Sequence, residues 1–145
     1  TALVEGRGEI VASLLPLPHR WVVVAIPPVP RRPGKTRQLY ESLKPIHYTD
    51  GRTTEKLVAE IQAGKEFSIS LLFNTFENVA FTEFSGLDVS RRYITKMGAT
   101  NVHLAGSGPA LFTMMEDKAQ AEDLYSRLKG QRLEPYLTET LPALE

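Results

Sequence analysis

Cysteine is absent from the 145-residue sequence, which excludes disulfide scaffolds, thiolate zinc sites and cysteine nucleophiles. Neither charge is in excess: 17 lysines and arginines balance 17 aspartates and glutamates, so no overall field favours DNA, RNA or an anionic membrane. No apolar run approaches the roughly 20 residues that span a bilayer, and no signal peptide is recognisable. These absences predict a cytoplasmic protein that binds neither nucleic acid nor membrane.

Familiar catalytic signatures are also missing. The sequence contains no G-x-S-x-G nucleophile elbow and no G-x-x-x-x-G-K-[ST] loop, so it is not a P-loop NTPase. The three histidines, His19, His47 and His103, lie far apart and match no metal-ligand spacing, which favours structural or surface roles. The sequence therefore predicts no metal site and offers no catalytic residue of its own.

What is present is ordinary for a globular protein, with 42% hydrophobic and 23% charged residues. The length suits one domain with a real hydrophobic core, and no internal repeat divides residues 1–145. The first residues, Thr1 to Val4, lack an initiator Met and read like the inside of a strand. We therefore expect one domain of a larger protein.

The N-terminal third predicts strands and a loop. Two short apolar runs around Gly6-Arg7-Gly8 indicate a hairpin over residues 2–14, and the β-branched run at 20–28 indicates a buried strand. Residues 27–35 carry four prolines and a glycine, so they must form a surface loop. This region holds the one obvious basic cluster, for which a solvated face is favoured over an anion site: Arg31, Arg32, Lys35 and Arg37.

Four stretches with helical patterns follow. Residues 36–44 begin with Thr36 as a plausible N-cap, and residues 53–64 end at a glycine. Residues 66–81 carry a broad apolar stripe at helical spacing, from Phe67 to Ala80. In residues 88–98 the expected apolar face joins Val89 to Met97.

The last part alternates between strand and helix. Short strands at 101–105 and 110–115 precede a helix over 117–130, with Asp117 and Gln120 as a capping-box candidate, and a final strand over 132–140. Pro135 marks that strand as an edge strand. The order predicts an α+β fold: a ferredoxin-like antiparallel sheet with helices on one face, extra helices inserted after the first long strand, and an N-terminal hairpin.

One glycine-rich stretch stands out between two of these strands: Gly106, Ser107, Gly108 and Pro109. The plain interpretation is a tight hairpin turn in which glycines supply left-handed conformations. The alternative is a nest of backbone N–H groups that faces an anion. The pattern favours the hairpin, but one loop can be both.

Several segments resemble a known family. "LAGSGPALF" resembles the third motif of the galactokinase, homoserine kinase, mevalonate kinase and phosphomevalonate kinase superfamily. "TALVEGRGEI", "NTFE" and "PPVPRRPGKTRQLY" are similar to segments of the 4-diphosphocytidyl-2-C-methyl-D-erythritol kinases of the non-mevalonate isoprenoid pathway. The resemblance covers residues 1 to about 140.

This resemblance implies the C-terminal, substrate-side domain of an ATP-dependent kinase that phosphorylates the 2-hydroxyl of the cytidine diphosphate substrate. ATP and Mg²⁺ would be bound mainly by an N-terminal domain, which also carries the family's catalytic Asp and Lys, and which would be this domain's partner. Residues 1–145 alone would be inactive. Two alternatives stay open: another small-alcohol kinase of the superfamily, or a free-standing ferredoxin-like ligand-binding or regulatory module.

The resemblance also implies site residues. Gly106, Ser107, Gly108 and Pro109 match the motif that borders the active site near the phosphates and substrate, whereas Ala110 stands where the family usually has Thr or Cys. Tyr40 matches the aromatic residue that stacks on the cytosine of the substrate; the alternative is a core aromatic of the first helix. Thr36 matches a threonine at the head of that helix and is expected to cap it.

Overall fold

The computed structural model describes residues 1–30, 33–65 and 68–141. Its strands are β1 (Ala2–Glu5), β2 (Ile10–Ser13), β3 (Trp21–Ile26), β4 (His103–Leu104), β5 (Leu111–Met115) and β6 (Glu134–Glu139). Its α-helices are α1 (Lys35–Ser42), α2 (Arg52–Gln62), α3 (Glu77–Glu83), α4 (Leu87–Lys96) and α5 (Lys118–Leu128). Within these residues no helix is long and apolar enough to cross a bilayer.

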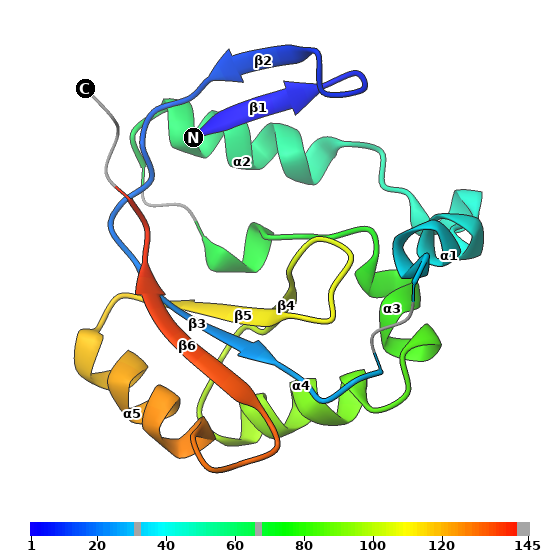
Figure 1. The fold of residues 1–145 in the computed structure, drawn as a ribbon. Helices are drawn as coiled ribbons and strands as arrows, with labels where there is room; N and C mark the ends of the chain where they lie inside the picture. Colours follow the sequence, from blue (N-terminus) through cyan, green and yellow to red (C-terminus); the bar gives the residue numbers. More distant parts are fainter. Residues whose placement is uncertain (31–32, 66–67, 142–145) are drawn as a thin grey trace.

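Four strands form an antiparallel sheet in the order β4-β5-β3-β6 (Figure 1). In chain order, the first and third of these strands are central and the second and fourth are at the edges, as in a ferredoxin-like sheet. Pro135 lies on the edge strand β6, opposite Ala25 of β3. No strand of the described sheet pairs with the outer side of β6, which is why an edge strand tolerates the missing N–H of a proline. The predicted fold class and edge strand are confirmed.

One face of the sheet carries the core. Because side chains alternate along a strand, Val23 and Ala25 of β3 point to the same face as Thr113 and Leu111, their partners on β5, and all four are buried. Helices α4 and α5 cover this face (Figure 1). They contribute buried side chains to the same cluster: Leu87, Ile94, Ala121, Leu124 and Leu128.

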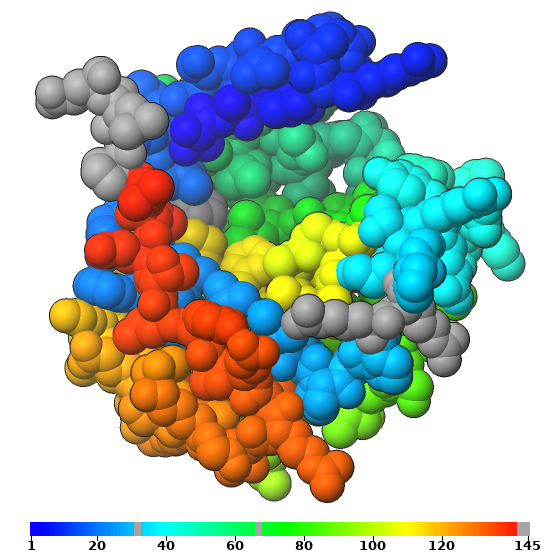
Figure 2. Space-filling model, viewed as in Figure 1, coloured from blue at the N-terminus to red at the C-terminus, as the bar shows by residue number. Residues whose placement is uncertain are grey.

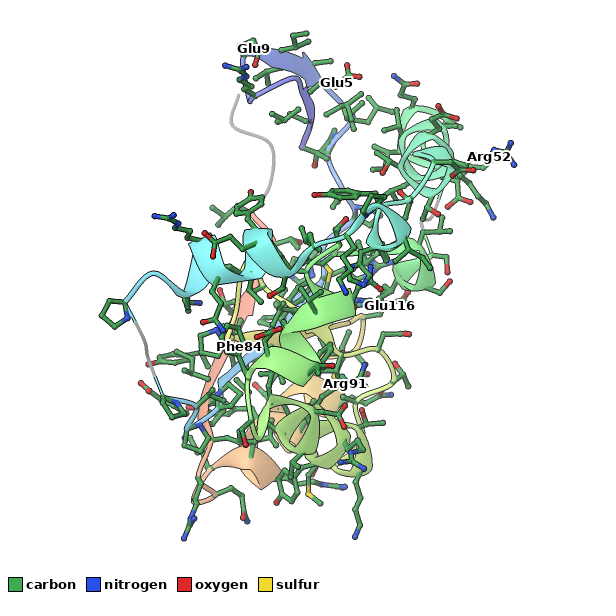
Figure 3. The ribbon with its side chains drawn as sticks, turned by 90° about the vertical axis from the view of Figure 1, so that its right-hand side faces the viewer. Glu5, Glu9, Arg52, Phe84, Arg91 and Glu116 are labelled. Atoms are coloured by element: carbon green, nitrogen blue, oxygen red, sulfur yellow. The ribbon has the colours of Figure 1, made fainter. Side chains whose placement is uncertain are left out.

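The opposite side of the sheet is not covered by α4 and α5. Both α2 and the β1-β2 hairpin lie on the side away from α4 and α5, so one of the inserted helices is outside the helical layer of α4 and α5 (Figure 1). The predicted hairpin is confirmed, with positive φ at Gly6 and Gly8. Figure 3 shows the hairpin, marked by Glu5 and Glu9, standing apart from the main body.

Three local expectations are wrong. Residues 66–81 do not form one helix: Phe67 lies outside the described residues, a 3₁₀ turn covers Ile69–Leu71, and α3 begins only at Glu77. The N-cap of α1 is Gly34 rather than Thr36. Val89 is 61% exposed, because the apolar face of α4 that meets the core is centred on Ile94.

Candidate functional site

The glycine stretch forms the turn between β4 and β5. Leu104 pairs with Leu111 in the last register position, so residues 105–110 connect the two strands and the predicted hairpin is confirmed. Gly106 has φ +54° and Gly108 has φ +66°, while Ser107 has no positive φ. These backbone angles are why two glycines are needed here: a Cβ is strained at such φ values. The Gly108–Pro109 peptide bond is cis.

The N–H groups of this turn divide into two sets. The Gly108 N–H donates to the Ala105 carbonyl at 2.8 Å, and the Ala105 N–H donates to the Ala110 carbonyl at 2.9 Å. No acceptor among the described residues meets the N–H groups of Gly106 and Ser107. Consecutive backbone N–H groups with no protein acceptor form the kind of arrangement that binds anions.

The carbonyls of the turn, in contrast, are held from outside by side chains. The Asn74 side-chain Nδ2 donates to the carbonyls of Leu104 at 2.9 Å and Gly106 at 2.8 Å. Lys35 Nζ donates to the Ser107 carbonyl at 3.2 Å. The carbonyls of Leu104, Gly106 and Ser107 therefore already accept hydrogen bonds from protein side chains.

The first turn of α1 lies against the same loop. The hydroxyls of Thr36 and Ser107 are 2.9 Å apart, and Lys35 Nζ is 3.5 Å from Ser107 Oγ. Lys35 Nζ also lies 6.0 Å from the ring centroid of Phe84, a buried side chain beneath α1 in Figure 3. Thr36 thus contacts the glycine turn instead of capping its own helix. The start of α1 places a cation and a hydroxyl at the turn.

Two residues before and at the start of α3 hold the strand that enters the turn. Glu77 Oε1 accepts from the Leu104 N–H at 2.7 Å. Asn74 Oδ1 accepts from the Phe76 N–H at 3.0 Å, so its amide oxygen is engaged within its own segment. Both residues belong to the "NTFE" segment, and the tertiary contacts place them at the glycine turn.

A cavity of about 490 Å³ opens beside the turn. Asn74 and Gly106 line it together with a group of aromatic side chains: Tyr40, Tyr48, Phe73, Phe76 and Phe112. In Figure 2 the segment around the turn (yellow) forms the floor of a hollow flanked by α1 (cyan) and α2 (teal). The volume and the aromatic lining suit a small ligand with a flat ring.

Tyr40 lies at the rim of this cavity. Its side chain is 62% exposed, and its ring meets that of Phe76 edge-on, with centroids 4.9 Å apart and an interplanar angle of 80°. The alternative of a core aromatic is therefore wrong: the core residue of α1 is Leu39, which is fully buried. An exposed ring beside a cavity leaves a π face available to a ligand.

Of the three histidines, His103 also lines the cavity, whereas His19 and His47 make their contacts elsewhere. His19 pairs with Glu139 at 2.6 Å, and His47 Nδ1 accepts from the Lys44 N–H. His103 Nδ1 is 3.4 Å from Glu77 Oε1, a contact whose angles do not make a hydrogen bond. The described residues contain no group of three His, Cys, Asp or Glu that could hold a metal ion.

The basic cluster is divided by the structure. Arg31 and Arg32 lie outside the described residues, and Arg37 pairs with Glu41 at 2.8 Å on the exposed side of α1. Of this cluster, Lys35 is the residue that the described structure brings to the glycine turn. A charge count along the sequence does not distinguish Lys35 from its neighbours, because the distinction depends on a contact 72 residues away.

Comparison with known proteins identifies the family of the chain. The family model described as "GHMP kinases C terminal" matches residues 53–134. A 4-diphosphocytidyl-2-C-methyl-D-erythritol kinase of Dehalococcoides mccartyi is 41% identical over all of this chain, which covers 51% of that kinase. The 4-diphosphocytidyl-2-C-methyl-D-erythritol kinase of Shouchella clausii is 29% identical over 90% of this chain, which covers 43% of that kinase. The chain thus spans about half the length of the curated relatives it matches.

Two solved structures are similar as well. The crystal structure of a 4-(cytidine 5'-diphospho)-2C-methyl-D-erythritol kinase matches with a TM-score of 0.75 and 25% identity, over 95% of this chain and 48% of the other. A homoserine kinase from Cytophaga hutchinsonii matches with a TM-score of 0.57 and 16% identity, over 97% of this chain and 47% of the other, a likeness of fold.

Proposed function

The chain belongs to the GHMP kinases through their C-terminal domain, and on this premise we propose that it is the substrate-side domain of an ATP-dependent 4-diphosphocytidyl-2-C-methyl-D-erythritol kinase. The full-length protein transfers the γ-phosphoryl group of ATP to the 2-hydroxyl of that substrate. A bond forms between the γ-phosphorus and the hydroxyl oxygen, and the bond between the γ-phosphorus and the bridging oxygen of ADP breaks. The hydroxyl proton passes to a base in the N-terminal half.

One observation carries the proposal: the aromatic cavity and the glycine turn form one continuous site, because Asn74 and Gly106 belong to both. The exposed ring of Tyr40 stacks on the cytosine, since aromatic side chains bind bases through their π faces. The unpaired N–H groups of Gly106 and Ser107 face a phosphate, with Lys35 nearby as a cation. Phosphoryl transfer depends mainly on such positioning and charge stabilisation.

The remaining parts of the enzyme belong to the other half of the protein. Within the described residues, no group of three His, Cys, Asp or Glu side chains could hold a metal ion. ATP and Mg²⁺ are bound mainly by an N-terminal domain, which supplies the catalytic groups, and residues 1–145 alone are inactive. The cytoplasmic location stays a prediction from the sequence.

The test uses the full-length protein with ATP and the cytidine diphosphate substrate, with product followed by ³¹P NMR. We expect Gly106→Val to lower kcat/KM by about 100-fold or more, because a residue with a Cβ is strained at φ +54° and shifts the N–H groups of the turn, which is equivalent to losing a transition-state donor. Apart from its two chain neighbours, no atom of the described residues lies within 4 Å of a Cβ at Gly106, so a valine side chain would project into open space beside the cavity.

Gly130→Val is the matched control. Gly130 also has a positive φ, +77°, and open space around its Cβ, but it follows α5, away from the cavity. The two variants share backbone strain and differ in location, so Gly130→Val retains activity. Equal kcat/KM values for Gly106→Val and wild type would contradict the role of the turn. A wild-type protein without ATP-dependent phosphorylation would favour the ligand-binding module.

A further inference from the structure

Asn74 is placed to control the glycine turn rather than to touch a ligand through its own donors. Its side-chain amide has two N–H bonds and one oxygen. The oxygen accepts from the Phe76 N–H at 3.0 Å, and Nδ2 donates to the Leu104 and Gly106 carbonyls at 2.9 and 2.8 Å. Both N–H bonds of the amide are therefore used within the protein, and the oxygen accepts one hydrogen bond there.

The bond to the Gly106 carbonyl determines the direction of a neighbouring donor. The Gly106–Ser107 peptide unit is planar and trans, so its N–H, which belongs to Ser107, points opposite to its C=O. Since Asn74 holds that C=O, the Ser107 N–H points away from Asn74. This N–H is one of the two in the turn that meet no acceptor among the described residues.

The bond to the Leu104 carbonyl holds the entry to the turn. The N–H of the same peptide unit belongs to Ala105 and donates to the Ala110 carbonyl across the hairpin at 2.9 Å. Glu77 holds the preceding N–H, that of Leu104, at 2.7 Å. Asn74 therefore holds the carbonyl of Leu104, the last residue of β4, and that of Gly106 in the turn, and a two-point contact of this kind resists rotation of the peptide units between them.

We propose that Asn74 is a positioning residue: its two-carbonyl contact directs the unpaired N–H groups of Gly106 and Ser107 toward the phosphate of the bound ligand. This inference rests on the proposed function for the identity of that ligand. The geometric part, that Asn74 maintains the conformation of the turn, stands independently of the reaction.

The experiment replaces Asn74 with aspartate in the full-length protein. Asn74→Asp keeps the oxygen that accepts from Phe76 but replaces the donor Nδ2 with a second oxygen, which repels both carbonyls. We expect kcat to fall about 100-fold, the effect of misplacing one backbone donor, while KM for the cytidine substrate stays within about threefold. If Asn74→Asp fails to fold, Asn74→Ala removes the same donors without adding a charge.

Asn78→Asp is the control. Asn78 is the second residue of α3, four residues after Asn74, and its Nδ2 donates to the His47 carbonyl at 2.9 Å, an equivalent amide-to-carbonyl contact outside the glycine turn. We expect its kcat to stay within about twofold of the wild-type value. A kcat for Asn74→Asp that equals that of Asn78→Asp would overturn the positioning role.

Amide hydrogen exchange tests the geometric part without relying on activity. The Ala105 and Gly108 N–H groups are protected by hydrogen bonds inside the turn, so loosening it in Asn74→Asp should speed their exchange at least about tenfold, with no change in Asn78→Asp. Unchanged exchange would overturn the inference even if the kinase proposal is correct. Faster exchange in a protein whose wild type lacks kinase activity would refute the proposed function and keep Asn74 as the residue that holds the turn.

Discussion

The two glycines of the turn, Gly106 and Gly108, are surrounded differently, although both flank Ser107 in the sequence. A Cβ at Gly108 would lie 2.6 Å from Leu104 Cδ1, whereas a Cβ at Gly106 meets no protein atom within 4 Å among the described residues. Leu104 is almost fully buried, so its side chain has little room to yield. Gly108 is therefore needed for packing, and Gly106 leaves space beside the cavity.

Tyr40 supplies a prediction at the scale of one side chain. Base stacking on an aromatic ring contributes about 1–3 kcal/mol, so Tyr40→Ala should raise KM for the cytidine substrate roughly tenfold or more in the full-length protein. Because the ring is 62% exposed, its loss should leave the free energy of unfolding nearly unchanged. Steady-state kinetics and denaturant titration measure the two effects.

Tyr40→Phe is the companion variant for this prediction. It keeps the ring and its edge-on contact with Phe76, so KM should stay near the wild-type value. An unchanged KM in Tyr40→Ala would remove Tyr40 from the substrate site.

Among the elements, α5 shows how local sequence signals act. Asp117 Oδ1 accepts from the Gln120 N–H at 2.8 Å, which satisfies one of the unpaired amides at the start of the helix. Asp117→Ala should therefore lower the free energy of unfolding of the full-length protein by about 0.5–2 kcal/mol, as measured by urea denaturation.

Asp123→Ala provides the comparison within the same helix. Asp123 is exposed and pairs with Arg127 one turn later, a contact worth only about 0.3–0.5 kcal/mol. A loss for Asp117→Ala no larger than that for Asp123→Ala would show that the cap contributes little.

The segment before α3 shows the limit of element prediction. Its apolar residues recur at helical spacing, but Leu72, Phe73 and Phe76 line the cavity. Asn74 interrupts the pattern because its side chain bonds the Phe76 N–H and two carbonyls about 30 residues away. A tertiary contact thus outweighs a periodicity that by itself indicates a helix.

At the scale of the whole molecule, the two faces of the sheet have separate tasks. The face under α4 and α5 is filled by buried aliphatic side chains, whereas the other face presents Phe112 to the cavity. Leu124→Ala should therefore cost about 2–5 kcal/mol of unfolding free energy while kcat and KM, measured well below the melting temperature, stay unchanged. A matching loss of kcat in the folded variant would contradict this separation.

The sequence by itself determined the hairpin, the buried strand β3, the edge strand β6 and the cap of α5. Each depends on nearby residues: positive-φ glycines, a β-branched run, a proline and an aspartate. Their order along the chain was enough to predict the ferredoxin-like sheet. The placement of Gly106 to Pro109 at a functional site, which the motif resemblance implies, stays a prediction.

Only the tertiary structure decided what surrounds that turn. Lys35 and Thr36 reach Ser107 from 72 and 71 residues away, and Asn74 reaches Gly106 across 32 residues. Local sequence propensities do not predict such contacts, because the contacts form only when separate elements pack together. Packing removes backbone carbonyls from water, and each buried carbonyl then requires a hydrogen-bond donor. The same packing left the Gly106 and Ser107 N–H groups without an acceptor among the described residues, and these are the donors on which the proposed function depends.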